Sequence, residues 1–483
     1  MATQGEIHPR DQNQVTEADF SDIVTDSEAE AVSDIIEKVN KGDTLLIEGD
    51  IKPILNRSAK KCTSCKWQKS QDGVAYVPYV VSTGYTDFER SMFVRAMKEY
   101  EVMTCVDFIS RTTEKDYLLI ENKAGCWSYV GKVGGKQSMS LSKAGCIKYN
   151  LIQHELMHAL GFNHEMTRKD RDNYIDVIWE NIAPADQAIF TIDNGDLQDM
   201  PYDYYSITHY LMSAFSRIPG EPSMVPKYNL TIPMGRAIGL DDLDVMKVNS
   251  LYDCNLCRRK LFAPGSTTYD STSLGQGKKR CLYLIQSTLK VRLQLSDINF
   301  PSSPDCNSAY IKVYDGVSPS SPVLLDRKCD RKPVPPLISS EDFILIEIVN
   351  NQLLASSTFT ASYERERYGN TFVQDNGVVT SPGFPGLYPS NVDVVYSIIA
   401  PTGYKVSLSF GFFWIENSTS CSKEYLTVMD GVLETSSILA TYCGFMDITP
   451  LVSTGNSLVL QFHSGDSAGF NGFYATYKFV TTS

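Results

Sequence analysis

The feature that most constrains this chain is a group of three histidines within 11 residues, at positions 154, 158 and 164. Hydrophobic spacing predicts a helix over Tyr149–Leu160. Residues four apart share one face of a helix, so His154 and His158 can present two imidazole rings to one metal ion. Gly161 permits the left-handed backbone that ends a helix, which allows His164 to return as a third ligand. The sequence therefore predicts a three-histidine metal site.

The same segment supplies the parts of a hydrolytic zinc site. Three protein ligands leave one position of a zinc ion open for water, and zinc lowers the pKa of that water to about 7. Glu155, beside the first histidine, can accept the proton of the water as a general base. The alternative is a helix whose histidines are ordinary surface or core groups. Gly161 and His164 at fixed offsets make the pattern much more specific than a bare His-Glu-x-x-His.

The 12 cysteines indicate an oxidising compartment. Their number is even, they are dispersed and none lies in residues 1–57, which is typical of disulfides in an exported protein. The alternative for Cys62 and Cys65 is half of a zinc site, but no second pair of suitable spacing accompanies them. Three N-glycosylation sequons agree with secretion, at Asn56, Asn229 and Asn417. We therefore expect a secreted, extracellular protein.

Acidic charge is concentrated at the start of the chain. The chain has 57 acidic and 44 basic residues, a net charge of −13, and residues 1–57 carry −8 of it. This balance, without Lys or Arg runs, argues against nucleic acid or anionic membranes as partners. No apolar run approaches the roughly 18 residues of a transmembrane segment. Met1–Phe20 lacks the apolar core of a signal peptide, so either the start of an exported precursor is missing here or export is unconventional, and we expect the first.

Hydrophobic periodicity divides the chain into two kinds of structure. Helical spacing over Asp87–Met103 belongs to a mixed α and β segment that extends almost to Cys257. After Cys257 the helical period disappears, and strict alternation such as Leu289–Leu295 predicts strands with one buried face. The sequence of Tyr310–Gly316 recurs 115 residues later in Tyr425–Gly431. A repeat of this length indicates two copies of a domain the size of a β-sandwich.

The stretch from His154 to Asp172 (HELMHALGFNHEMTRKDRD) resembles the signature of the astacin family, zinc proteases of the metzincin group. The resemblance extends from about Ser58 to Cys254. It includes the segments GCWSYVG at residues 125–131 and LYDC at residues 251–254. It implies an α+β metzincin-type zinc protease domain over residues 58–254. It also implies that residues 1–57 are an acidic propeptide that is removed on activation.

The resemblance implies roles for individual residues. Tyr210 matches the tyrosine that can ligate zinc at rest and swing to stabilise the oxyanion. Glu165 matches the residue that receives the new amino terminus after activation. Asp50 matches the propeptide aspartate that fills the open position of zinc and silences the zymogen. We expect a trypsin-like protease to cut between Arg57 and Ser58.

One position departs from the family pattern. The residue two before the tyrosine is usually a methionine, which forms a turn beneath the metal, and here it is Thr208. Threonine is smaller, and its hydroxyl needs a hydrogen-bond partner when it is buried. All three histidines and the base are present, so we expect activity, with reduced zinc retention or stability.

The second half resembles two CUB domains, all-β jelly-roll-like sandwiches, at residues 257–365 and 368–479. The segment SPGFP at residues 381–385 is typical of that family. Together the two resemblances imply six disulfides: Cys62–Cys65, Cys105–Cys254, Cys126–Cys146, Cys257–Cys281, Cys306–Cys329 and Cys421–Cys443.

Many CUB domains bind calcium through three acidic residues. Glu416, Glu424 and Asp466 fall at the matching positions of the second copy, and carboxylate oxygens suit Ca²⁺. The alternative is that they are ordinary solvated loop acids. The first copy has Ala309 where Glu424 would fall, so we expect no calcium there.

A protease followed directly by two CUB domains resembles the amphibian hatching enzymes. This implies a zinc endopeptidase, made as a zymogen, that digests the glycoproteins of the egg (vitelline) envelope after docking through its CUB domains. Two alternatives stay open. One is a matrix- or growth-factor-processing protease of the tolloid kind, and the other is a CUB-mediated binding protein with an impaired protease.

Overall fold

The computed structural model describes residues 31–43, 45–53, 65–193, 200–227, 231–271, 280–301, 305–351, 356–431, 437–466 and 469–481. The chain divides into two compact units, Met1–Lys260 and Leu261–Ser483. Several predicted residues lie outside the described part of the chain: the cleavage pair Arg57 and Ser58, Cys62, and the sequons at Asn56 and Asn229.

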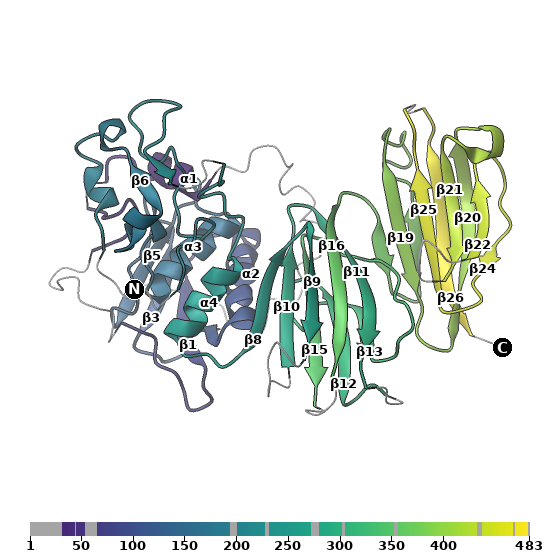
Figure 1. The fold of residues 1–483 in the computed structure, drawn as a ribbon, viewed down its shortest axis with the longest axis horizontal. Coiled ribbons are helices and arrows are strands. Elements are labelled where there is room, and N and C mark those ends of the chain that lie inside the picture. Colours follow the sequence, from purple (N-terminus) through teal and green to yellow (C-terminus); the bar gives the residue numbers. More distant parts are fainter. Residues whose placement is uncertain are drawn as a thin grey trace, which may run out of the picture. The chain divides into compact units, whose positions relative to one another are not determined.

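The first unit combines helices with one mixed sheet (Figure 1). Its α-helices are α1 (Val32–Val39), α2 (Asp87–Met103), α3 (Tyr149–Leu160) and α4 (Asp242–Leu251). The predicted bounds of α2 and α3 are confirmed. A capping box starts α2, where the hydroxyl of Thr86 accepts the amide of Glu89 and the Glu89 carboxylate accepts the amide of Thr86. Every residue from Leu151 to Leu160 is buried, so α3 is the central helix of this unit.

The sheet of the first unit has the order β2-β1-β3-β5-β4. Its strands are β1 (Ala75–Val81), β2 (Val106–Ser110), β3 (Tyr117–Glu121), β4 (Cys126–Trp127) and β5 (Lys136–Leu141). The four neighbours β2, β1, β3 and β5 run parallel, whereas the edge strand β4 is antiparallel to β5. A separate small sheet pairs β6 (Ile175–Val177) with β7 (Met224–Pro226), and short 3-10 helices follow α3, the first of them η3 (Glu165–Thr167).

The second unit is built of strands, with no α-helix among its described residues (Figure 1). The first repeat has sheets β13-β12-β15-β10-β8 and β14-β11-β16-β9. Its strands are β8 (Cys257–Phe262), β9 (Gly265–Asp270), β10 (Arg280–Gln286), β11 (Lys290–Asn299), β12 (Ala309–Asp315), β13 (Val323–Lys328), β14 (Leu337–Ile338), β15 (Phe343–Asn350) and β16 (Thr358–Glu366). Residues 257–260 of β8 fall within the first unit.

The second repeat has sheets β17-β19-β25-β21-β22 and β18-β26-β20-β23, with β24 paired to β20. Its strands are β17 (Asn370–Phe372), β18 (Asn376–Thr380), β19 (Asp393–Ile399), β20 (Tyr404–Ile415), β21 (Tyr425–Asp430), β22 (Ser437–Tyr442), β23 (Gly444–Phe445), β24 (Leu451–Val452), β25 (Ser457–His463) and β26 (Gly472–Thr481). The repeated sequence segments form β12 and β21, and each lies second from the edge of its sheet. The repeat in sequence is therefore a repeat in architecture.

The structure contains four disulfides that the resemblances implied, Cys105–Cys254, Cys126–Cys146, Cys306–Cys329 and Cys421–Cys443. Cys65, Cys257 and Cys281 are also disulfide-bonded, and none of the described cysteines is a free thiol. Within the same described ranges, no helix has both the length and the apolar composition required to cross a membrane.

Candidate metal centre

Three histidine rings converge at the end of α3. His154 and His158 lie one turn apart on the helix, fully buried, with their Nε2 atoms 3.0 Å apart. Gly161 then takes the left-handed conformation, with φ 117°, and turns the chain away from the helix axis. His164 returns on this turn, and its ring centroid lies 4.6 Å from that of His158. The three rings thus face one point, as the spacing predicted.

An oxygen atom beside each ring fixes its orientation. His154 Nδ1 donates to the carbonyl of Ile207 at 2.8 Å, and His158 Nδ1 donates to the carbonyl of Phe162 at 2.7 Å. His164 Nδ1 donates to the Glu48 carboxylate at 2.9 Å. A proton on Nδ1 leaves Nε2 able to present a lone pair to the centre, which is the tautomer that a metal ion would require.

Asp50 fills the point on which the rings converge. Its Oδ2 lies 2.8 Å from Nε2 of His154, and its Oδ1 lies 3.3 Å from Nε2 of His164 and 3.6 Å from Nε2 of His158. Burial acts to raise the pKa of Asp50, but the charges of His164 and His158 and hydrogen bonds from His154 and His158 hold it well below its ordinary value. The carboxylate is therefore ionised.

These residues fit a zinc ion. The Nε2 atoms of His154 and His158, 3.0 Å apart, can face each other with a proton or a metal cation between them. Asp50 Oδ1 and His164 Nε2 are buried and have no hydrogen-bond partner among the described residues. A set of three imidazole nitrogens and one carboxylate oxygen, buried and within 4.8 Å of one another, is a donor set typical of zinc.

The segment that carries Asp50 is docked on the rest of the unit. The side chain of Asn40 donates to the carbonyls of Gly49 and Cys126 and accepts the amide of Cys126 at 2.8 Å. The amide of Ser128, directly after β4, donates to the carbonyl of Asp50 at 3.1 Å. The backbone approaches so closely that a Cβ on Gly49 would lie 2.9 Å from the Tyr210 hydroxyl. This N-terminal segment, described over residues 31–43 and 45–53 and called the leader below, thus lies at the edge of the sheet beside the metal centre.

Glu155 lies beside the first histidine with its carboxylate fully buried. Neither of its oxygens has a hydrogen-bond partner among the described residues. Burial, together with the negative charge of Asp50, raises the pKa of Glu155 well above its ordinary value. The sequence predicted this residue as a general base, and that role stays a prediction.

Tyr210 reaches the same centre from a separate loop. Its ring centroid lies 4.4 Å from that of His164. Its hydroxyl donates to the carbonyl of Glu48 at 2.9 Å and lies 3.4 Å from Oδ2 of Asp50. In this state the leader therefore holds the tyrosine hydroxyl.

Glu165 belongs to a buried charge network that sequence reasoning missed. Its Oε2 accepts from Lys247 at 3.0 Å, and its Oε1 accepts from Arg168 at 2.9 Å. Lys247 also pairs with Asp203 at 2.9 Å and with Asp244, one turn earlier in α4. The only sequence signal was the spacing of Asp244 and Lys247, three residues apart, which puts them on one face of α4.

Thr208, the departure from the family pattern, is buried with its hydroxyl satisfied. Thr208 Oγ1 lies 3.0 Å from Oγ of Ser206, which in turn donates to Asp244 at 2.6 Å. The carbonyl of Thr208 accepts the amide of Glu165 at 3.2 Å. The threonine therefore has the partner that burial requires, and it connects the turn to the Glu165 network.

The three predicted calcium ligands do not form one cluster among the described residues. Glu424 is buried and accepts from the Tyr388 hydroxyl and from the amide of Gly465, whereas Glu416 pairs with Lys423 at 3.1 Å. Asp466 is exposed. The calcium site stays a prediction, as does glycosylation at Asn417, which is exposed.

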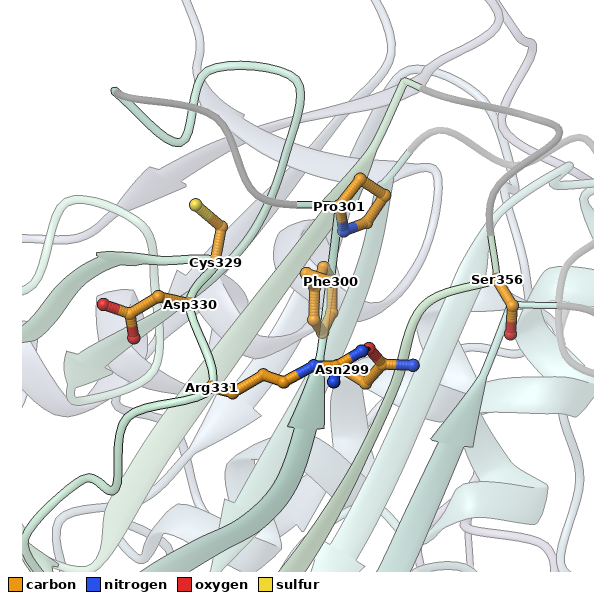
Figure 2. Close-up of a pocket in the computed structure, with 7 residues that line it drawn as sticks. All are labelled: Asn299, Phe300, Pro301, Cys329, Asp330, Arg331 and Ser356. Carbon is orange, nitrogen blue, oxygen red and sulfur yellow. Dashed lines mark hydrogen bonds between the residues drawn. The ribbon is translucent and has the colours of Figure 1, made fainter.

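A further cavity lies in the first repeat (Figure 2). It has a volume of about 540 Å³ and is lined by Asn299, Phe300, Pro301, Cys329, Asp330, Arg331 and Ser356. Arg331 donates to the side-chain oxygen of Asn299 at 2.8 Å across it. Of the predicted residues it contains Cys329 alone, and that residue is part of a disulfide.

Comparisons with known proteins agree with this architecture. The model of the Astacin peptidase family matches residues 61–253, and the CUB domain model matches residues 257–363 and 368–477. Embryonic protein UVS.2 of Xenopus laevis is 37% identical over 473 residues, 96% of this chain and 91% of that protein. An astacin-like metalloendopeptidase of Coturnix japonica is 38% identical over 355 residues, 72% of this chain and 86% of that protein.

A solved structure also matches, that of high choriolytic enzyme 1, a hatching enzyme zinc-protease from Oryzias latipes. It is 41% identical and covers 41% of this chain and 100% of its own, with a TM-score of 0.40. The family matches and the buried centre define a metallopeptidase with appended β-sandwiches. The chain belongs to the astacin family of metalloendopeptidases, which is zinc-dependent, and carries CUB domains after its peptidase domain.

Proposed function

We propose that this protein is a secreted endopeptidase made as a zymogen, with zinc held by His154, His158 and His164. The observation that carries the proposal is the convergence of three imidazole nitrogens and one carboxylate oxygen on one buried point. When bound, zinc supplies a Lewis acid and lowers the pKa of a coordinated water molecule. The residues of the chain supply the remaining chemistry.

Glu155 is the proposed base and Tyr210 the proposed stabiliser of the oxyanion. The Glu155 carboxylate directly follows His154 in sequence, is fully buried and has no hydrogen-bond partner among the described residues, so it can take the proton of a water molecule and then pass it to the leaving amine. Once the leader departs, the Tyr210 hydroxyl loses its acceptor, the carbonyl of Glu48, and becomes free to donate to developing negative charge.

The proposed domains are a propeptide at 1–57, a peptidase domain at 58–254 and CUB domains at 257–365 and 368–479. Asp50 supports the zymogen proposal, because it lies among the three histidines in the place of a substrate or water. A trypsin-like protease is proposed to cut between Arg57 and Ser58. Glu165, buried beside the metal centre, is then the proposed acceptor of the new amino group.

The proposed substrates are egg-envelope glycoproteins that the CUB domains dock. Two sequence similarities support this choice: to UVS.2, described as an embryonic protein, over nearly the whole chain, and to the hatching enzyme of Oryzias latipes over 238 residues. Calcium in the second CUB domain remains part of the proposal through Glu416, Glu424 and Asp466. Of these, Glu424 is already held in place by Tyr388.

The peptidase proposal is tested with the full chain, activated by trypsin and assayed on casein. We expect about one zinc per chain by atomic absorption, and Glu155→Gln should lower kcat at least about a hundredfold while the zinc stays bound. Glu180→Gln, at an exposed position of the same unit, is the matched control and should have no effect. A folded wild-type chain that binds no zinc and cleaves nothing would overturn the proposal.

The substrate proposal needs a separate test. The activated chain is offered egg-envelope and matrix extracts, and the new amino termini of the fragments are sequenced. We expect cleavage of envelope glycoproteins. Cleavage of collagen precursors alone would indicate a matrix-processing protease of the tolloid kind instead.

A further inference from the structure

The short segment after the peptidase domain is anchored in the peptidase unit. The CUB domain model begins at residue 257, yet the compact unit of the peptidase extends to Lys260. The Arg258 guanidinium donates to the carbonyl of Val102 at 2.9 Å, and the amide of Lys260 donates to the Asp242 carboxylate at 2.9 Å. These residues therefore pack as part of the peptidase.

The side chain of Lys260 enters the interior of that unit. Its ammonium group forms an ion pair with the carboxylate of Glu99 in α2, and both side chains are 0% exposed. The two residues lie 161 positions apart in sequence. Removal of one member of a buried ion pair leaves an uncompensated charge in the interior, which is strongly unfavourable.

Glu99 also binds α3 directly. It accepts from the hydroxyl of Tyr149 and from the side-chain amide of Gln153 at 2.7 Å. Gln153 immediately precedes His154, its backbone carbonyl accepts from Tyr100 at 2.8 Å, and its side-chain oxygen accepts the amide of Leu240 at 3.0 Å. The Glu99 carboxylate thus holds the first two turns of the helix that carries the metal ligands.

We propose that Lys260 is a positioning residue for the metal centre, supplied by the chain after the peptidase domain. Lys260 neutralises Glu99, and Glu99 then holds Tyr149 and Gln153 so that His154 and Glu155 keep their orientation. The inference rests on the proposed function, since it assigns zinc binding to α3. It also means that a peptidase domain ending at Cys254 lacks one of its buried partners.

The test compares three variants of the full chain, Lys260→Met, Glu99→Gln and the double variant that joins them. Lys260→Met should lower Tm by about 10 °C, because a buried charge is left unpaired. It should also speed zinc loss to a chelator about tenfold, as disturbed support of metal ligands does. In the double variant, where neither charge remains, both properties should return close to those of the wild type.

The control is Arg259→Met, which removes the partly exposed neighbouring pair with Asp242. It should leave Tm and the rate of zinc loss unchanged. In active variants, kcat should fall with Lys260→Met while KM stays constant, because Lys260 does not contact substrate.

Each outcome decides the inference. If Lys260→Met fails to fold and the double variant folds with zinc, the role of the pair is supported. Two results would overturn the proposal that Lys260 positions the metal centre. One is a lower Tm of Lys260→Met without faster zinc loss, and the other is a double variant with the same Tm and rate of zinc loss as Lys260→Met. Lys260 would then have a structural role only. A wild type without zinc would instead overturn the proposed function, and the Tm comparison would still report on the ion pair.

Discussion

At the scale of single residues, Asp50 lies among the three histidines of the metal centre. Its carboxylate lies within 2.8 to 3.6 Å of all three Nε2 atoms, while the hydrogen bonds of Asn40 hold the leader independently of it. Asp50→Ala should therefore give the uncut chain measurable casein hydrolysis, below that of the processed enzyme. Asp43→Ala, an exposed acid of the same leader, is the control. If the uncut Asp50→Ala chain hydrolyses casein no faster than the uncut wild type, Asp50 does not block the metal centre.

Thr208 shows that a departure from a family pattern can be accommodated by its surroundings. The side chain is 2% exposed and hydrogen-bonded to Ser206, so a longer side chain there must displace its buried neighbours. Restoring the methionine with Thr208→Met should lower the free energy of unfolding by about 1–3 kcal/mol through overpacking. Thr208→Ser, which keeps the hydroxyl, should cost less. A higher Tm for the methionine variant in thermal unfolding would contradict this prediction and show that Thr208 lowers the stability of the chain.

Asp107 on β2 provides a pH-dependent prediction away from the metal. Burial, with the charge of Glu101, raises its pKa from 3.8 to about 6. The folded state binds the proton more tightly than the unfolded chain, so this stabilisation is complete below about pH 3.8 and is lost as pH rises through 6. Asp107→Asn should therefore stabilise the chain at pH 8, by about 1 kcal/mol after allowance for solvent screening, and have little effect at pH 4.

Asp72 serves as the control for that measurement. It accepts the amide of Val74 and the hydroxyl of Tyr76, and these hydrogen bonds lower its pKa. Asp72→Asn should therefore destabilise the chain at pH 8 and not at low pH, the opposite sign. Equal responses of the two variants to pH in thermal unfolding would refute the burial argument.

At the scale of elements, the loop at Gly235 supports the segment that carries Tyr210. Gly235 has φ +70°, and a Cβ there would lie 2.4 Å from the carbonyl carbon of Tyr210 and from the amide of Leu211. Because backbone atoms cannot move aside cheaply, Gly235→Ala should displace Tyr210 and lower kcat about tenfold or more.

Gly220 separates this steric effect from backbone strain. It also has a positive φ, of +84°, but a Cβ there would meet no atom within 4 Å. Gly220→Ala should therefore cost about 1 kcal/mol of stability and leave kcat unchanged. Similar kcat values for the two alanine variants would contradict the argument from close approach.

The helices of the peptidase unit were predictable because their signals are local. The periodicity and the capping box at Thr86 define α2, and the histidine spacing and Gly161 define α3. The parallel order β2-β1-β3-β5 was not predicted, because the pairing of strands depends on contacts between distant segments.

At the scale of the whole molecule, the leader is docked by contacts that do not need its covalent link. Val32, Ile35 and Ile36 of α1 are buried. The side chain of Asn40 forms hydrogen bonds with both the amide and the carbonyl of Cys126. A synthetic peptide of residues 31–53 should therefore inhibit the processed enzyme in trans. The same peptide with Asn40→Ala should inhibit at least about tenfold more weakly, since three hydrogen bonds are lost.

The measurement is the inhibition constant of each peptide against casein hydrolysis by the processed enzyme. A peptide with Asp43→Ala is the control. Equal inhibition by the parent and the Asn40→Ala peptides would show that the leader is not held in the way the structure describes. Removal of residues 1–57 also removes −8 of the net charge of −13, so ion-exchange chromatography separates cut from uncut chain.

By itself, the sequence determined the family, the repeated β-domains and the residues that converge on the metal centre. It could do so because those residues follow local spacing on one helix and its terminal turn. Only the tertiary structure showed that Lys247 forms an ion pair with Glu165, that Asn40 forms hydrogen bonds with the backbone of Cys126, and that Lys260 forms an ion pair with Glu99. These pairs join residues 82 to 161 positions apart, and burial between distant segments leaves no periodic pattern in the sequence.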